Sequence, residues 1–538
     1  MNADTLPGQL LLVYVLATVT AALLGAWLAR RYRAALLPLM RSAPAADAAR
    51  IDRKPDSLPA QATTALPSWR APTALTPTHH RAAQARVVAL LLGLSLAIAL
   101  TRGAIWLWLA REDGAPFSLP RLFTLAVVYA WPVLPALGLM WRWSWGRLAL
   151  ALLGWYAGSL ALVMLRSNEA QSLLAVAGWL AGEIGPPTLA LMLLTLRRTR
   201  AAAPWLWPPL ALLWFAAVLG LNGLSALVLQ GSPLITPLVR YVSPGWAMLL
   251  FALAAAALAW WPVQHFARAL ARLYSAKRVS DLMVVFSAAW ALNLGFDALG
   301  AGPLVLLSLL WIPLALMLLS RRRLRTQARP PTLLVLRVFQ HDANVNALFD
   351  DVVERWRASG NTVLIAGTDL VDLTLDATDL FDYLDGRLGA RFIRSPGEVA
   401  PRLAALDWLP DADGRWRVNE CYCHDSTWQV ALAALVDRAD RVLMDLRGFA
   451  AHNAGCRYEL GVLAHAAHLQ TAVILTDTST DLATAQAAAA AAPDTRFVWL
   501  ALPAGAVAAR RATRQRVLSA LLGQPATPAL AAPTAALP

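Results

Sequence analysis

The chain has 538 residues, of which 58% are apolar and only 15% charged, and its mean hydropathy is +0.51. This balance excludes an ordinary soluble globular protein, because more apolar surface is present than water-soluble domains bury. The formal net charge is +14, yet residues 331–538 hold 18 Arg, no Lys and 23 acidic residues, so residues 1–330 carry about +19. The positive charge lies in the apolar half, where basic loops set membrane topology, and we expect no nucleic-acid partner.

The first apolar run, residues 9–29, predicts a membrane-spanning helix. No Lys or Arg precedes it, and Arg30, Arg31 and Arg33 follow it at once, which is the reverse of a cleaved signal peptide. Because positive flanks stay in the cytosol, we expect a retained anchor with its N-terminus outside. Residues 34–84, rich in Ala, Pro, Arg and Thr without a sustained period, predict a flexible cytosolic loop.

Eight further apolar runs are long enough to cross a hydrocarbon core of about 30 Å. They lie near 87–110, 122–141, 148–165, 172–196, 208–229, 245–262, 281–299 and 302–320. With the N-terminus outside, the loops rich in Lys and Arg all fall on the cytosolic side, whereas the opposite loops hold only Arg111, Arg121, Arg166 and Arg240. Residues 1–330 are therefore predicted to form a multi-pass domain of about nine transmembrane helices in the inner (plasma) membrane.

Four polar side chains interrupt these spans: Arg102, Glu183, Asn293 and Asp297. An ionisable group within a span is a functional-site hypothesis by default, and Arg102 and Asp297 are candidates for a pair in a transport pathway. The alternative is that each group lies within a turn or two of an interface and snorkels to water. The sequence shows no repeat that would indicate the inverted halves of a transporter.

From Pro330 the pattern changes to short apolar runs that alternate with helical segments, which predicts parallel strands in βαβ units. We expect residues 331–522 to form a cytosolic α/β domain and residues 523–538 a disordered tail. Strands are predicted at 333–339, 362–366, 441–446, 472–475 and 497–500, a hairpin at 411–421 that turns at Asp413-Gly414, and helices at 345–358, 426–436 and from Asn453.

Two patterns in this region resemble metal sites and are interpreted otherwise. Cys421 and Cys423 form a CxC run, which lacks the CxxC spacing of zinc sites, so we expect them and Cys456 to be reduced, partly buried thiols. The acidic residues of 368–385 match no EF-hand loop and indicate the solvated face of a helix. No metal is predicted.

The segment ADRVLMDLRGFAAHNAGCRYELGVL, residues 439–463, resembles the TIR (Toll/interleukin-1 receptor) domain. Its strand leads through a short loop to a helix with the C-x-x-E-L pattern, here Cys456, Glu459 and Leu460. The continuation ELGVLAHAAHLQTAVIL is similar to nucleoside 2-deoxyribosyltransferase-like proteins. Both resemblances imply a flavodoxin-like fold. Gly455 departs from the Trp that is usual in TIR domains, and residues 445–449 are not the usual serine-containing loop.

The resemblance implies that Glu459 is a catalytic carboxylate that acts at the anomeric carbon of a ribosyl group. A carboxylate near the positive end of a helix costs little to keep ionised. Ligands of βαβ units bind beyond the carboxyl ends of the strands, which makes eight residues candidates for substrate binding. They are Phe339, His341, Asp342, Asp445, Arg447, Gly448, Asn453 and Cys456.

Each of these residues also has an interpretation without a ligand. Glu459 is then a solvated helix residue, Arg447 a solvated loop residue, Asn453 a helix N-cap and Asp445 an acceptor for loop amides. His341 is then a surface imidazole.

The sequence thus predicts a membrane-anchored, TIR-like signalling or effector protein of bacterial defence that hydrolyses the N-glycosidic bond of NAD or a related nucleotide. No cofactor is expected besides this substrate, and TIR-like domains are expected to self-associate. Two alternatives stay open. One is a non-enzymatic module that binds a nucleotide or a partner, and the other is a transporter with a regulatory cytosolic domain.

Overall fold

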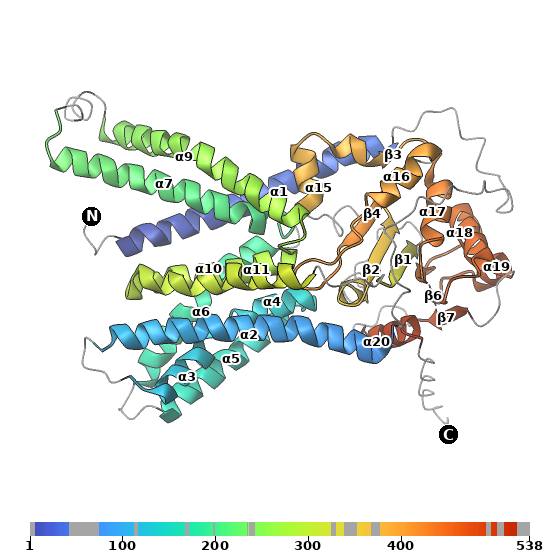
Figure 1. The fold of residues 1–538 in the computed structure, drawn as a ribbon, viewed down its shortest axis with the longest axis horizontal. Coiled ribbons are helices and arrows are strands. Elements are labelled where there is room, and N and C mark those ends of the chain that lie inside the picture. The colour runs from blue at the N-terminus through green and yellow to red at the C-terminus, as the bar shows by residue number, and fades with distance from the viewer. Residues whose placement is uncertain are drawn as a thin grey trace, which may run out of the picture.

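The computed structural model describes residues 6–41, 75–111, 117–166, 172–196, 199–233, 235, 241, 243–323, 330–337, 352–366, 377–424, 426–490, 496–502 and 510–523. Figure 1 shows a bundle of long helices beside an α/β part that holds the C-terminal half of the chain. Three predicted site residues, Phe339, His341 and Asp342, lie outside the described residues, as does the predicted tail beyond Gly523.

Within the described ranges, eight helical segments are long and apolar enough to cross a membrane, as in a multi-pass membrane protein. The bundle consists of α1 (Leu6–Arg41), α2 (Pro77–Leu109), α3 (Leu119–Tyr129), α4 (Val133–Met140), α5 (Trp145–Arg166), α6 (Leu173–Thr195), α7 (Ala203–Leu229), α9 (Pro244–Ser275) and α10 (Asp281–Ala301), with α3 and α4 together forming one span. The ninth predicted span is shorter: the 3₁₀ helix η4 (Pro303–Leu310) continues as α11 (Trp311–Arg323), and its apolar part ends at Leu319.

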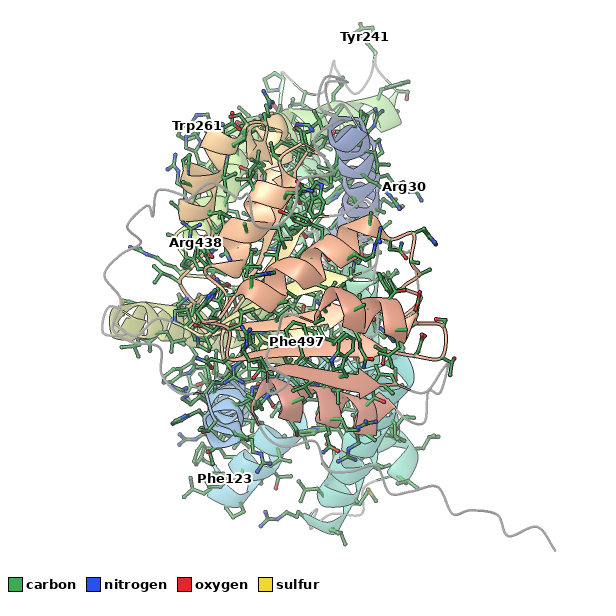
Figure 2. The ribbon with its side chains drawn as sticks, turned by 90° about the vertical axis from the view of Figure 1, so that its right-hand side faces the viewer. Arg30, Phe123, Tyr241, Trp261, Arg438 and Phe497 are labelled. Carbon is green, nitrogen blue, oxygen red and sulfur yellow. The ribbon has the colours of Figure 1, made fainter. Side chains whose placement is uncertain are left out.

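Large apolar side chains cover the outside of the bundle. Leu150, Leu258 and Trp261 are 71%, 82% and 67% exposed, and Figure 2 shows Phe123 on the outer surface of the helices behind the α/β part. Such a continuous apolar surface would be unfavourable in water and is matched by the hydrocarbon of a bilayer.

The helices alternate in direction, and one end of the bundle meets the α/β part. Tyr32 near the end of α1 contacts Tyr422, with 3.1 Å between the hydroxyl oxygens, and His80 at the start of α2 contacts Ser359 at 2.5 Å. The loops predicted to be cytosolic therefore lie on the same side as the α/β part. Both ends of the predicted loop 34–84 are helical, because α1 extends to Arg41 and α2 begins at Pro77, and residues 42–74 lie outside the described residues.

The four polar residues predicted within the spans form one buried network. Arg102, whose side chain is fully buried, donates to Glu183 at 2.6 and 2.7 Å, to Asp297 at 2.7 Å and to Asn293 at 2.8 Å. Its guanidinium also stacks on the Tyr129 ring, 3.6 Å from the centroid. The predicted contact of Arg102 with Asp297 is confirmed. Since α2, α6 and α10 each supply a charged member, the network ties three helices together.

The α/β part is a seven-stranded sheet in which every described strand pair is parallel, in the order β3-β4-β2-β1-β5-β6-β7. The strands are β1 (Thr332–Arg337), β2 (Asn361–Ile365), β3 (Phe392–Ile393), β4 (Val418–Cys423), β5 (Arg441–Asp445), β6 (Thr471–Thr476) and β7 (Phe497–Ala501). The predicted hairpin at 411–421 is wrong: Asp413-Gly414 does lie in a turn, closed by the Asp411 amide on the Arg415 carbonyl at 2.8 Å, but β4 pairs in parallel with β2 and β3.

Helices cover both faces of the sheet, as the alternation of side chains along a strand requires. One face packs Leu334, Val442 and Ile474 against α16 (Val399–Ala404), α17 (Trp428–Val436), α18 (Ala454–His465) and α19 (Leu482–Ala488). The other packs Leu333, Leu443 and Val473 against α20 (Arg510–Leu521) and α13 (Glu354–Trp356). The predicted helix 345–358 is described only from Val352 onward. Figure 1 shows α17, α18 and α19 on the side away from the bundle.

Helix α15 (Ala377–Leu384) lies between the sheet and the bundle, where it contacts α1 and α9. It covers part of the acidic stretch that was predicted to be a solvated face. Asp379 is instead buried and forms an ion pair with Arg391 of the 3₁₀ helix η6 (Leu388–Arg391), while the 3₁₀ helix η7 (Pro396–Glu398) leads into α16. Residues 368–376 of that stretch lie outside the described residues.

The amino-terminal ends of β2 and β4 face the membrane helices through a cluster of buried charges, here called the junction. Glu354 accepts from Arg142 at 2.5 Å, from Arg415 at 3.0 Å and from Arg357 at 3.1 Å, and Arg357 also pairs with Asp281 at 3.2 Å. Burial alone would raise the pKa of Glu354, but the three arginines outweigh it and lower the pKa to about 2.

A second group of charges continues the junction toward α9. Arg417 pairs with Asp411 at 2.9 Å, donates to the Tyr274 carbonyl at 2.5 Å, and stacks on the Tyr274 ring. Lys277 forms an ion pair with Asp407. These contacts hold the amino-terminal ends of β2 and β4, and the described strands are parallel, so the carboxyl ends of β1 and β5 lie at the opposite end of the sheet from the junction. Tyr422, near the carboxyl end of β4, also contacts α1.

Replacing Arg102 by Leu tests the buried network. The change leaves Glu183 and Asp297 as uncompensated buried carboxyls, so we expect the free energy of unfolding in detergent to fall by about 3–5 kcal/mol. The exposed Arg111 just beyond the same helix is the matched control, and Arg111→Ala should cost less than about 0.5 kcal/mol. Equal losses in the two variants would show that the network contributes nothing.

Candidate functional site

The sheet order places a topological switch point between β1 and β5. From β1 the chain builds outward through β2 on one side, then returns to the other side of β1 with β5, and continues through β6 to β7. In open parallel sheets, ligands bind beyond the carboxyl ends of the two strands at such a point. Those ends are Arg337 and Asp445, which are direct partners in the register of β1 and β5.

Helix α18 brings Glu459 to this point. The helix starts at Ala454, as predicted, with Asn453 in the N-cap position. The Asn453 side chain does not cap the helix but accepts the Ala450 amide at 2.8 Å, which fixes the loop before it. The face of α18 turned to the sheet contains Cys456, Glu459 and Leu460. A solvated Glu459 is therefore ruled out, because its side chain is only 4% exposed.

Glu459 is buried without the partners that a buried carboxylate needs. Its Oε2 atom has no hydrogen-bond partner among the described residues. Burial raises the pKa of Glu459 to about 8, against a smaller opposing effect from the Arg337 charge. The expectation that the helix end keeps this group ionised therefore fails: desolvation exceeds the helix field, and the carboxyl is mostly protonated at neutral pH.

Cys456 lies on the same face, one turn before Glu459. Burial, and then the neighbouring Glu459, raises the pKa of the Cys456 thiol well above its usual value. Its sulfur lies 3.9 Å from the Arg337 carbonyl oxygen, which is the geometry of a weak S–H donor. A protonated thiol is a poor nucleophile, so Cys456 packs at the site and does not attack a substrate.

The loop after β5 is closed by an ion pair. Arg447 donates to Asp445 through Nε at 2.8 Å and Nη2 at 2.6 Å, and Asp445 also accepts the Arg447 amide at 3.2 Å. Gly448 follows with φ of +77°, a backbone conformation that residues other than glycine rarely adopt. Both interpretations of Asp445 thus meet here: it satisfies a loop amide and it lies at the strand end where a ligand would bind.

Five of the predicted site residues, all from one βαβ unit, surround the carboxyl end of β5: Asp445, Arg447, Gly448, Cys456 and Glu459. Asn453 supports the loop between them. Sequence reasoning missed Arg337. This residue is 3% exposed, and its positive charge opposes the rise in the pKa of Glu459. A signal was present, since Arg337 is a cation that ends the otherwise apolar strand TLLVLR.

A separate polar cavity of about 240 Å³ lies near the other edge of the sheet, beside β4. Its lining includes Arg391, Arg402, Asp407 and Glu420. Cys421 and Cys423 are free thiols with sulfurs 3.6 Å apart. Within the described ranges, no cluster of three or more His, Cys, Asp or Glu side chains has the arrangement of a metal site.

Searches of protein-family models, curated proteins and solved structures find no match to this chain. The TIR-like resemblance therefore stays a prediction that depends on the residues of one βαβ unit.

The raised pKa of Glu459 predicts a pH-dependent stability. An unfolded glutamate titrates near 4.5 and the folded one near 8, so between these values the folded state binds the extra proton. The free energy of unfolding should then fall as pH rises through this window, by about 1.4 kcal/mol per unit, and level off above it.

Glu459→Gln removes this slope, because the amide does not titrate. We expect the variant to equal the parent near pH 4.5 and to be more stable at pH 9, measured by unfolding in detergent. Asp437→Asn, at an exposed carboxyl, should leave the parent slope unchanged. A Glu459→Gln protein that keeps that slope would contradict the assignment.

Proposed function

We propose that the α/β part binds NAD or a related nucleotide beyond the carboxyl ends of β1 and β5, and that Glu459 takes part in cleaving its N-glycosidic bond. One observation carries the proposal: at the switch point of the sheet stands a buried carboxyl whose Oε2 atom has no hydrogen-bond partner among the residues that the structure describes. Unsatisfied buried carboxyls are costly, and strongly raised pKa values concentrate at functional sites.

The substrate itself would supply Glu459 with a positively charged partner. The nicotinamide ring of NAD is a pyridinium cation, and a cation beside Glu459 favours its ionised form. The bond between C1′ and the ring nitrogen then breaks with both electrons moving to the nitrogen, so neutral nicotinamide leaves without a general acid. The Glu459 carboxylate stabilises the positive charge that develops at C1′, or attacks it, and water completes the hydrolysis.

Other groups at the site are suited to the rest of a nucleotide. Arg337 ends β1 at the switch point, and its guanidinium is of the kind that pairs with phosphate oxygens. The Arg447–Asp445 pair offers a carboxylate and a guanidinium at the neighbouring strand end. A ribose hydroxyl can donate to the first of these and a phosphate can accept from the second.

The distribution of basic residues supports one orientation of the protein in the membrane. Arg142, Arg147, Arg200 and Arg278 lie at the bundle end that meets the α/β part, which favours a plasma-membrane protein with its N-terminus outside and its α/β part in the cytosol. We propose a signalling or effector role of the TIR-like kind, in which bilayer tethering raises the local concentration of self-associating α/β parts.

A second candidate is a nucleotide-binding module without turnover. It is favoured by the protonated state of Glu459, since a neutral carboxyl cannot stabilise an oxocarbenium-like transition state. The transporter alternative is less well supported, because the charged side chains of the Arg102 network bind one another rather than lining a cavity.

Nicotinamide release from NAD by the full-length protein in lipid nanodiscs tests the proposal. We expect Glu459→Gln to lower the rate by about 10²-fold or more, the magnitude typical for loss of one electrostatic catalytic group. Since the ionised form is the active one, kcat/KM of the parent should rise with pH up to about 8, the pKa of the free protein.

Asp437→Asn serves as the matched control and should keep the parent rate. NAD binding without release, unaffected by Glu459→Gln, would favour the binding module. Release that persists at the parent rate in Glu459→Gln would contradict the catalytic role.

A further inference from the structure

A cavity of about 210 Å³ opens between the membrane helices close to the junction. It is lined by α4, the turn between α4 and α5, α6, and Arg200 just before α7. Since α4 and α6 end on the side of the α/β part and α5 and α7 begin there, the cavity lies where the helices leave the apolar layer. It is therefore at the depth of lipid headgroups.

The lining divides into an apolar wall and a basic rim. The wall is formed by aliphatic side chains, Leu139, Leu148, Leu191 and Met192 among them. The rim carries two guanidinium groups, Arg142 and Arg200, and two indoles, Trp143 and Trp145. Indoles at this depth favour the headgroup region, and cations there attract anionic lipids. The combination suits an amphiphile with an anionic head.

One buried polar atom in the wall also lacks a partner. Thr188 is among the residues that line the cavity, and its buried Oγ1 atom has no hydrogen-bond partner in the described part of the chain. It follows Pro186 and Pro187, which interrupt the backbone hydrogen bonds of α6.

The junction beside the cavity has more cations than anions. Arg142, Arg357 and Arg415 surround Glu354 and Asp281, so these five side chains together carry one positive charge in excess. Because Glu354 is held by two further arginines, Arg142 can also pair with a second anion on the cavity side.

We propose that this cavity binds one anionic phospholipid, with its phosphate between Arg142 and Arg200 and its acyl chains along the outer faces of α5 and α6. Those faces expose Leu150 and Leu189, which are 71% and 63% exposed. The bound headgroup is linked to the α/β part through Arg142 and Glu354, so the lipid stabilises the junction. This proposal is independent of the role of Glu459.

Native mass spectrometry and thermal unfolding of the detergent-purified protein test this. With dioleoyl phosphatidylglycerol we expect one tightly held lipid and a saturable rise in Tm, and with dioleoyl phosphatidylcholine at least tenfold weaker binding. Glycerol 3-phosphate and inorganic phosphate, the soluble sources of the same anion, should give no saturable rise. A rise equal to that with phosphatidylglycerol would assign the site to a free anion and overturn the proposal.

Arg200→Gln should weaken phosphatidylglycerol binding about tenfold or more, as expected for loss of one charge-assisted contact. Arg147→Gln is the matched control, because Arg147 is exposed at the same end of α5 and does not line the cavity. Met192→Trp fills the cavity while keeping both arginines and should also abolish the bound lipid. Equal effects of Arg200→Gln and Arg147→Gln, or tight binding retained by Met192→Trp, would contradict the site.

Discussion

Compensation of buried charge is the constraint on which this structure depends. At the junction, Glu354 lies buried among Arg142, Arg357 and Arg415, and between the helices Arg102 is shared by two carboxylates. An isolated buried ion would cost several kcal/mol, so each of these groups fixes the position of its partners. The junction thereby holds the amino-terminal ends of β2 and β4 against the bundle. Glu459 departs from the rule, and that departure identifies the candidate site.

The strands and membrane helices could be predicted from the sequence, because buried or lipid-facing segments appear in it as apolar runs of characteristic length. Strands buried on both faces are short apolar runs, so β1, β2, β5, β6 and β7 were each predicted to within about two residues. The membrane helices follow from length and composition alone. Asn453 and the C-x-x-E-L pattern placed the start of α18 and the position of Glu459 on it.

Features that depend on partners distant in sequence could not be predicted. Asp413-Gly414 forms its turn, but Arg415 pairs with Asp281 of α10 and Arg417 donates to the Tyr274 carbonyl of α9, and β4 pairs in parallel with β2 and β3. Two-residue β3 shows no period to detect. The protonated state of Glu459 also depends on its surroundings, because helix position indicates ionisation whereas desolvation, visible only in the fold, raises the pKa. Arg337 was missed because its role depends on its position relative to Glu459, which lies more than 100 residues later in the chain.

The central claim is that Glu459 is a protonated buried carboxyl that ionises when a cationic nucleotide binds. Infrared difference spectroscopy of the full-length protein at pH 7, with and without NAD, tests it most directly. The account predicts that NAD removes a protonated-carboxyl C=O band and adds a carboxylate band, and that both changes are missing in Glu459→Gln. A parent spectrum in which saturating NAD changes neither band, or changes that persist in Glu459→Gln, would contradict it.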